Sequence, residues 1–348
     1  MIPTIHFRRF VLAFFLAVFT IPPSLHGKDT PKGAESSVTV DQALLWLPAN
    51  TETLIVTQGP FDLKPVEPAD QKAGQSPPLD KVLQLLPCGL PNQQKSNPLK
   101  SLKGLTVVFV MEGARGFRSP KGLGLIPYDG CHIIVFKDDL KAARESFIEA
   151  LKSENSEDEL VAGQKTYVIK QKFEEDAWNF YFAIPRPNVI LTATDRAYLE
   201  EVLKRIAMKE KPTDRALPEN LPEWKHVDRK AKFWGMRHYD KLNAKNDPST
   251  PLTTENRAAN VPDLKAIGLV FGYDPAKENL ISVKYLSDNQ DAARIAARGW
   301  THETEGLEPR IQEKVKGVVD ISVELKNERV KGMFLMVFLA AVGHAVYI

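Results

Sequence analysis

Short apolar stretches separated by polar turns run along most of this chain, and their pattern is typical of β-strands. The stretches are residues 53–57, 105–111, 132–136, 165–172, 178–184, 189–194, 231–239, 266–273, 280–286 and 318–325. Other segments carry apolar residues at helical spacing and predict helices; they are residues 40–47, 79–86, 140–151, 195–206 and 288–298. Many strands in sequence with a few helices between them predict an α+β fold.

Three segments are expected to interrupt these elements. Gly59-Pro60 should end the first strand, because proline cannot donate to a strand ladder. Residues 113–130 are rich in Gly and Pro and are predicted to form one long loop. The acidic residues 153–159 are predicted to form a surface loop, since a charge run is usually solvated.

One motif occurs twice, 150 residues apart: an apolar strand, an aspartate, three further residues and then Ala-Ala-Arg. The first copy runs from Asp138 to Arg144 and the second from Asp288 to Arg294. In each copy the aspartate is expected to cap a helix and the alanines to pack against the sheet. Because the order of strands and helices also repeats, we predict two related units of antiparallel sheet with helices packed on one face.

A proline-rich stretch separates the two units. Pro212, Pro218 and Pro222 fall close together, and prolines at this density are typical of connectors. We therefore predict a first α+β unit at residues 38–210, a linker at 211–230 and a second unit at 231–348. The length of 348 residues fits two moderate domains.

The N-terminus has the pattern of an export signal. A basic lead with Arg8 and Arg9 precedes a continuous apolar run at residues 10–21, and Pro22-Pro23 ends it. The run is shorter than the ~20 residues of a membrane-spanning helix. We predict that residues 1–27 are a signal peptide or an uncleaved N-terminal anchor, followed by a flexible leader at 28–37. The protein is therefore expected to be exported, either periplasmic or secreted.

Two features leave alternatives open. Residues 332–348 carry no Lys, Arg, Asp or Glu, so they form either a buried ending of the second unit or a membrane contact. Cys88 and Cys131 are the only cysteines. They form either one disulfide, which the oxidising compartment of an exported protein permits, or two separate buried thiols.

Charge excludes one large class of function. Apart from residues 1–27, basic and acidic residues are equal in number. A nucleic-acid binder needs an excess of cations to neutralise phosphates, so we expect no nucleic-acid partner. The 43% hydrophobic and 26% charged content is that of a folded globular protein.

Catalytic and metal-binding motifs are missing from the sequence. The seven histidines show no metal-ligand spacing, and no nucleophile elbow or phosphate loop occurs. The most polar run ends in His238, Tyr239 and Asp240. An ordinary half-buried strand is the better explanation of this run, because alternation of side chains between the two faces is what any such strand shows. We expect no metal, no cofactor and no catalytic site, and keep these three residues only as candidates for one.

Several segments carry a resemblance. Residues 40–56, followed by Gly59-Pro60-Phe61, resemble the opening of uncharacterised exported proteins found in planctomycete-type bacteria. Residues 233–240 and the ending at 343–347 are similar to that group as well. The resemblance implies export and a shared fold. It implies no activity, because none is attached to the group.

These observations favour an exported, non-enzymatic envelope protein, a binding or assembly module whose sheet or Gly/Pro loops contact an envelope protein or a surface ligand. One alternative is a hydrolase-like enzyme with a site between the two units, in which His238 would meet Asp274 or His302 in a pocket. A second alternative is a structural protein tethered to the membrane through residues 10–21 or 332–348. The hydrolase alternative requires His238 and its partner to lie close together in the fold.

Overall fold

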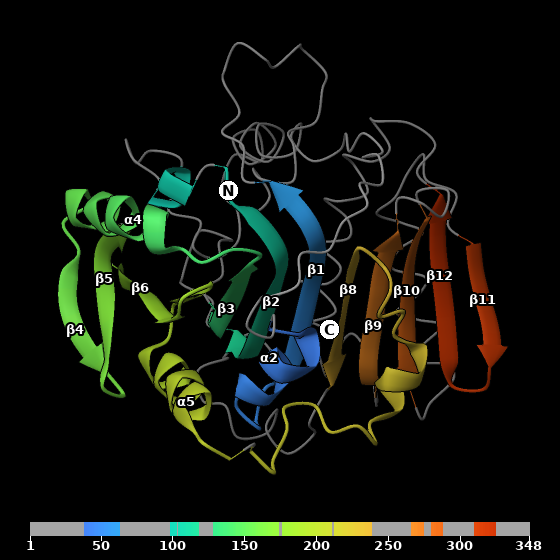
Figure 1. Cartoon of the computed structure of the whole chain (residues 1–348). Coiled ribbons are helices and arrows are strands. Elements are labelled where there is room, and N and C mark those ends of the chain that lie inside the picture. Colours follow the sequence, from blue (N-terminus) through green and yellow to red (C-terminus); the bar gives the residue numbers. More distant parts are fainter. Residues whose placement is uncertain are drawn as a thin grey trace, which may run out of the picture.

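In the part of the chain that the structure describes, twelve antiparallel strands form one open sheet (Figure 1). The computed structural model describes residues 38–62, 98–102, 104–117, 128–173, 176–210, 212–238, 266–274, 280–287 and 310–324. Along the sheet the strands follow the order β11-β12-β10-β9-β8-β1-β2-β3-β7-β6-β5-β4. Their bounds are β1 (Thr53–Asp62), β2 (Thr106–Phe117), β3 (Tyr128–Phe136), β4 (Glu157–Val161), β5 (Gln164–Phe173), β6 (Asp176–Arg186), β7 (Val189–Ala193), β8 (Phe233–His238), β9 (Ala266–Asp274), β10 (Leu280–Ser287), β11 (Arg310–Val315) and β12 (Val318–Glu324).

The two halves of the sheet share one order of connections. In the first half β1, β2 and β3 form a meander, and β7 returns to pair with β3. In the second half β8, β9 and β10 form a meander, and β12 returns to pair with β10. The expected α+β class is confirmed. The halves are also joined, because β1 pairs with β8 and places Ile55 opposite Gly235.

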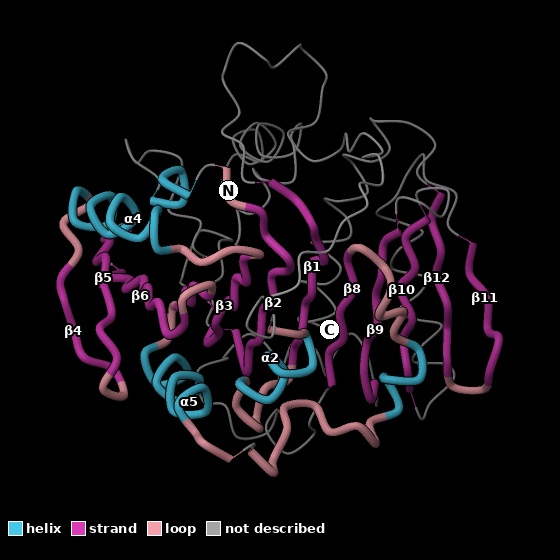
Figure 2. Tube along the Cα trace, in the orientation of Figure 1, coloured by secondary structure: helices cyan, strands magenta, loops and turns pink. Residues whose placement is uncertain are grey.

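Helices cover both faces of the first half. On one side, which we call the α5 face, pack α2 (Val40–Trp46) and α5 (Arg196–Ala207). On the other side, the α4 face, pack α4 (Lys141–Ser153) and the 3₁₀ turn η2 (Pro98–Leu102). Figure 2 shows these helices beside a continuous band of strands. The sequence had suggested helices on one face, so the covering of the sheet differs from that expectation.

Strand β3 explains why both faces are covered. Ile133 and Val135 belong to the apolar cluster under α5, whereas Ile134 and Phe136 belong to the cluster under α4. All four side chains are buried. A strand that is apolar on both sides must exclude water on both sides, and a helix on each face does so.

The helix starts follow the local sequence. Thr39 and Gln42 form a capping box at α2, and the Asp195 carboxylate accepts from the Tyr198 backbone N–H at α5. At α4 the cap expected at Asp138 or Asp139 is not the N-cap: Leu140 holds that position, and the Asp139 carboxylate accepts from the Lys141 backbone N–H. The helix predicted after the second copy of the motif lies outside the described residues, so the internal repeat stays a prediction.

Gly59 marks a close approach between strands and not the end of one. β1 continues past Gly59-Pro60 to Asp62, with a break in register between Gln58 and Phe61. A Cβ at Gly59 would lie 2.2 Å from the Val107 carbonyl oxygen. Only glycine lets the two backbones come this near.

Both edge strands were missing from the sequence prediction. The acidic stretch predicted as a loop contains the start of β4, and β11 was not expected at all. The Gly/Pro-rich stretch predicted as one loop is strand at both ends, since β2 runs to Phe117 and β3 begins at Tyr128.

The stretch predicted as a linker is packed on the α5 face. Ala216, Leu217 and Glu223 are buried, and the 3₁₀ turn η3 (Pro222–His226) lies against β8 and β9. Residues 1–37, the helices expected at 79–86 and 288–298, and residues 332–348 lie outside the described residues. In the described part no helix has both the length and the apolar character of a membrane span.

Candidate functional site

His238 is the sequence candidate that the structure describes most fully. It is the last residue of β8, and its Nδ1 atom lies 2.8 Å from Oε1 of Glu223. The His238 side chain is 29% exposed, whereas that of Glu223 is fully buried. The other candidates, Tyr239 and Asp240, lie outside the described residues, as does His302.

Asp274 and His238 lie at opposite ends of the paired strands β9 and β8. In β9 the residue opposite His238 is Gly268, and Asp274 comes six residues later along the same strand. At about 3.3 Å of rise per residue the two positions are roughly 20 Å apart. The structure therefore does not bring His238 and Asp274 together, and the alternative partner His302 stays untested.

Glu223 was not found by sequence reasoning. It belongs to η3, whose first residue is Pro222, a favoured start for such a turn. The next residue, Trp224, meets Trp234 of β8 edge to face, with ring centroids 6.3 Å apart. This contact holds η3 on the sheet and carries Glu223 to the end of β8. No pattern within this proline-rich stretch indicates a buried carboxylate at Glu223. Its burial depends on the contact between Trp224 and Trp234, and Trp234 lies on a strand that follows the stretch in the chain.

A polar group occupies the α5 face of β10 and β12. Lys284 Nζ donates to the His226 carbonyl oxygen at 3.3 Å, and Ser282 Oγ donates to Asp320 Oδ1 at 3.0 Å. Lys284 and Asp320 are register partners on neighbouring strands. Partial burial and the positive charges of Lys284 and Lys225 lower the pKa of His226 below its ordinary value, while Asp320 acts the other way.

The Ser282 hydroxyl lies far from His238. Ser282 is opposite Gly272 of β9, and Gly272 is opposite Trp234 of β8. The path from Ser282 to His238 therefore crosses two strand spacings and four residues of rise, roughly 16 Å in all. A nucleophile and its base must lie within hydrogen-bond reach, so these two side chains cannot act as such a pair.

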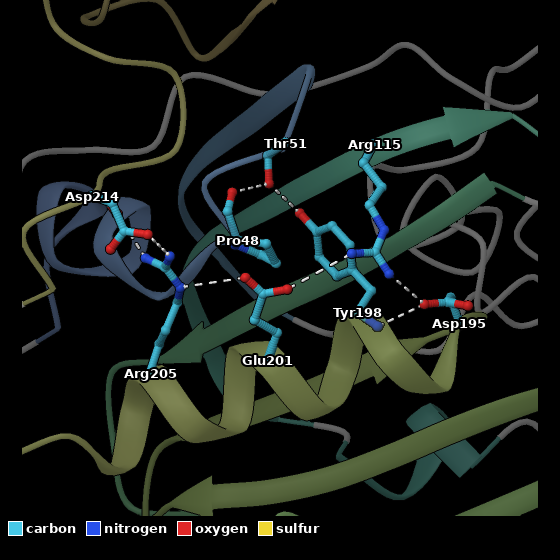
Figure 3. Close-up of polar contacts among 8 residues, drawn as sticks. All are labelled: Pro48, Thr51, Arg115, Asp195, Tyr198, Glu201, Arg205 and Asp214. Atoms are coloured by element: carbon cyan, nitrogen blue, oxygen red, sulfur yellow. Dashed lines mark hydrogen bonds and ion pairs between the residues drawn. The ribbon is translucent and has the colours of Figure 1, made fainter. Parts of the chain in front are cut away.

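A second polar network surrounds Tyr198 in the first half of the molecule (Figure 3). The Tyr198 hydroxyl and Thr51 Oγ1 lie 2.7 Å apart, and Thr51 Oγ1 donates to the Pro48 carbonyl at 2.7 Å. Because the Thr51 proton is used there, Tyr198 is the donor of the shared bond. Complete burial holds the pKa of the Tyr198 phenol well above its ordinary value.

Alternating charges extend this network along α5. Arg115 pairs with Asp195 at 3.1 Å and lies 3.7 Å from Glu201, and Arg205 lies 3.9 Å from Glu201 and pairs with Asp214 at 2.7 Å (Figure 3). The acids and arginines come from β2, α5 and the stretch that follows α5. Each charge therefore has an opposite neighbour, and the network fastens α5 to the sheet.

Gly113 makes room for this arrangement. A Cβ at this position would lie 2.7 Å from both the Tyr198 hydroxyl and a methyl group of Leu47. A larger residue would push α2 and α5 away from β2. The network thus holds α2 and α5 against β2.

The acidic edge of the sheet is protected by ion pairs. On β4, Glu157 pairs with Lys170 of β5 at 2.6 Å, and Asp158 pairs with Lys165 of β5 at 2.6 Å. Glu159 pairs with Arg196 of α5 at 2.5 Å. Charged side chains on an edge strand discourage unspecific pairing with other chains.

The opposite edge exposes apolar side chains. On β11, Ile311 is 40% exposed and Val315 is 58% exposed. Four large hydrophobic side chains are exposed in the described part of the chain, and the other two are Leu160 at 70% and Met208 at 54%. Leu160 belongs to β4, so three of the four lie on the two edge strands. The two edge strands are therefore the candidate interaction surfaces.

The groups that could hold a metal are scattered. In the described part of the chain no three His, Cys, Asp or Glu side chains come together as a metal site. Cys131 is buried on β3, and Cys88 lies outside the described residues, so their pairing stays a prediction. Comparisons with protein-family models, with curated proteins and with solved structures return no match to this chain.

Proposed function

We propose that this protein is an exported, non-enzymatic binding or assembly module that accepts an added strand at the β11 edge of its sheet. One observation carries the proposal: β11 is the last strand of the sheet, and Ile311 and Val315 on it are exposed. A strand with one paired side and one open side is a template for another extended chain.

The backbone of β11 supports this mode of binding. β11 pairs with β12 from Arg310 opposite Ser322 to Val315 opposite Val318. Among the described strands none pairs with its other side, and Figure 1 draws β11 as the outermost strand. An added strand would satisfy its outward N–H and C=O groups and cover Ile311 and Val315.

Charge indicates the chemistry of the occupant. Arg310, Lys314 and Lys316 lie on β11 and its turn, against a single acid, Glu313. An extended segment with acidic and aliphatic residues would therefore complement this edge, and a basic one would be repelled. The expected partner is an acidic extended strand of another polypeptide in the envelope.

A peptide experiment tests the proposal. The full chain is mixed with a capped peptide of alternating Glu and Val, and amide hydrogen exchange is followed in residues 310–315. We expect the peptide to raise protection of these amides and a matched Lys-Val peptide to leave them unchanged. The Ile311→Glu, Val315→Glu variant should lose the effect, because it removes apolar area and adds negative charge that repels the acidic peptide.

The control variant is Met208→Glu, which makes the same kind of change at a comparably exposed hydrophobic residue that lies on neither edge strand. It should bind the peptide like the original chain. Protection that is absent with the acidic peptide, or that persists in the β11 double variant, would overturn the proposal.

Export is part of the proposal and rests on residues 1–27. Fractionation of cells that express the chain with and without these residues should move the protein from the envelope fraction to the cytosol. Retention of the shortened chain in the envelope would contradict a signal function. It would favour a membrane contact through residues 332–348 instead.

A further inference from the structure

We infer that the strand added at β11 is β4 of a second copy of this chain, so that copies join head to tail and continue one sheet. This inference rests on the proposed function, because it names the occupant of the β11 edge. The two edges carry three of the four exposed large hydrophobic side chains of the described residues, Leu160 on β4 and Ile311 and Val315 on β11. Contact between the edges would cover Leu160 and Ile311, whereas Val315 is opposite Val318 and lies on the α5 face.

The charges of the two edges are complementary. β4 begins with Glu157, Asp158 and Glu159, whereas β11 and its turn carry Arg310, Lys314 and Lys316 around one acid. The β4 acids already pair with Lys170, Lys165 and Arg196, yet their side chains remain 63%, 48% and 36% exposed. A carboxylate has two oxygens and several acceptor positions, so each can take a second cation from the neighbouring copy.

Strand direction allows the contact. All neighbours in the sheet are antiparallel, and the number of strands is even. Along such an alternating sheet the two edges run in opposite senses. A second copy whose faces continue those of the first therefore brings its β11 antiparallel to β4. Antiparallel pairing is the mode already used throughout the molecule.

The side chains also meet on the correct face. Leu160 is opposite Lys165, which lies over the Tyr167 ring, and Tyr167 belongs to the α4 cluster. Ile311 is opposite Ile321, which alternates with Asp320 on the other face. Leu160 and Ile311 thus share the α4 face. A register that places them opposite each other also sets Glu159 opposite Gln312 and Asp158 opposite Glu313, so the complementarity lies in the overall charge of the two edges and not in paired positions.

The resulting assembly is open and weak at each joint. A contact between two different surfaces does not close on itself unless the rotation happens to complete a ring. Sheet twist rotates each strand relative to the next, so successive copies would follow a screw axis. β4 has 5 residues and β11 has 6, and such a short pair buries less area than a standard interface. Assembly should therefore depend on concentration and weaken with salt.

Cysteine pairing provides the decisive experiment. Two full-length chains are prepared in a Cys88→Ser background, one with Leu160→Cys and the other with Ile311→Cys. A directly opposed pair has its Cα atoms at about 4.5–5.5 Å, within the range of a disulfide. We expect the mixture to form a covalent dimer under mild oxidation, seen on a non-reducing gel. Neither chain should do so alone.

The matched control replaces Leu160→Cys by Met208→Cys, which is exposed but lies on no edge. It should form no dimer with the Ile311→Cys chain. A dimer of Ile311→Cys with itself, or no dimer in the mixture above the Met208 control, would overturn the head-to-tail contact.

Failure of this inference can be told apart from failure of the proposed function. If the acidic peptide protects β11 while the cysteine chains stay monomeric, the edge accepts a strand from another protein. If the peptide also fails, strand addition at β11 is itself wrong. Light scattering of the original chain gives a further readout: the mean mass should rise at low salt and fall in the Leu160→Lys variant.

Discussion

The two halves of the sheet present different side chains on the α5 face. In the first half the register partners Ile133 and Leu191 are apolar and fully buried. In the second half Lys284 and Asp320 are partners on the corresponding strands, the third strand of the meander and the strand that returns to it. One connection order therefore supports an apolar core in one half and a polar group in the other.

The difference follows from what covers each half. α5 is a twelve-residue helix that places Tyr198, Leu199, Val202 and Leu203 on the first half. η3 has 5 residues, and its backbone carbonyl at His226 accepts from Lys284. A short turn with unpaired carbonyls is best covered by donors, whereas a long amphipathic helix is best covered by apolar residues.

Ile133→Ala should lower the free energy of unfolding by about 2–5 kcal/mol, because it leaves a cavity in a fully buried core. The matched change in the second half, Lys284→Met, keeps the aliphatic stem and removes one hydrogen bond. It should cost about 1 kcal/mol. Urea denaturation measures both. Equal losses in the two variants would show that the halves are not packed differently.

The Glu223–His238 contact should show the larger coupling of the two hydrogen-bonded pairs. Glu223 is fully buried and bonded at 2.8 Å. A double-mutant cycle with Glu223→Ala and His238→Ala should give about 1.5–3 kcal/mol, the range for a bond to a charged group. A coupling near zero would mean that η3 is held by its tryptophan contact alone.

The Thr51–Tyr198 bond should show a smaller coupling, because neither hydroxyl is charged. The cycle with Thr51→Ala and Tyr198→Phe should give about 0.5–1.5 kcal/mol in the same denaturation assay. A coupling energy larger than that of the Glu223–His238 pair would contradict this expected order of the two pairs.

His226 should give the smallest effect, seen only in the pH dependence of stability. Its pKa is lowered in the folded protein, so the unfolded chain binds more protons below about pH 6.5. Stability is therefore expected to fall as the pH drops through that value. His226→Gln should reduce this pH-dependent loss in the free energy of unfolding by less than about 1 kcal/mol, since the side chain is partly solvated. The control His238→Gln leaves His226 in place and should retain the His226 component of the slope.

Sequence patterns identified the strands inside the sheet and missed its edges. Residues 132–136 and 189–194 are apolar on both sides, and β3 and β7 appear where the pattern indicated. Strand β4 was concealed in an acidic stretch, and β11 combines Arg310, Glu313 and Lys314 with two apolar residues. Edge strands are selected to carry charge, so the pattern that marks an interior strand is absent from them.

The proposed binding surface was missed for the same reason. The sequence indicated that a sheet or Gly/Pro loops would be the contact surface, but His238, the candidate residue that the structure describes, lies at the end of β8, in the middle of the sheet. Glu223 was concealed in a proline-rich stretch that reads as a connector. Its burial depends on Trp224 meeting Trp234 on a strand that follows it in the chain.

By itself the sequence determined that this chain is built from short strands with a few capped helices, because apolar period and cap residues act over neighbouring positions. Tertiary structure alone decided that β1 joins β8 in one sheet, that helices cover both faces, and that β4 and β11 form its ends. Those outcomes depend on which distant segments pair, and the backbone hydrogen bonds that pair them carry no mark in the amino-acid sequence.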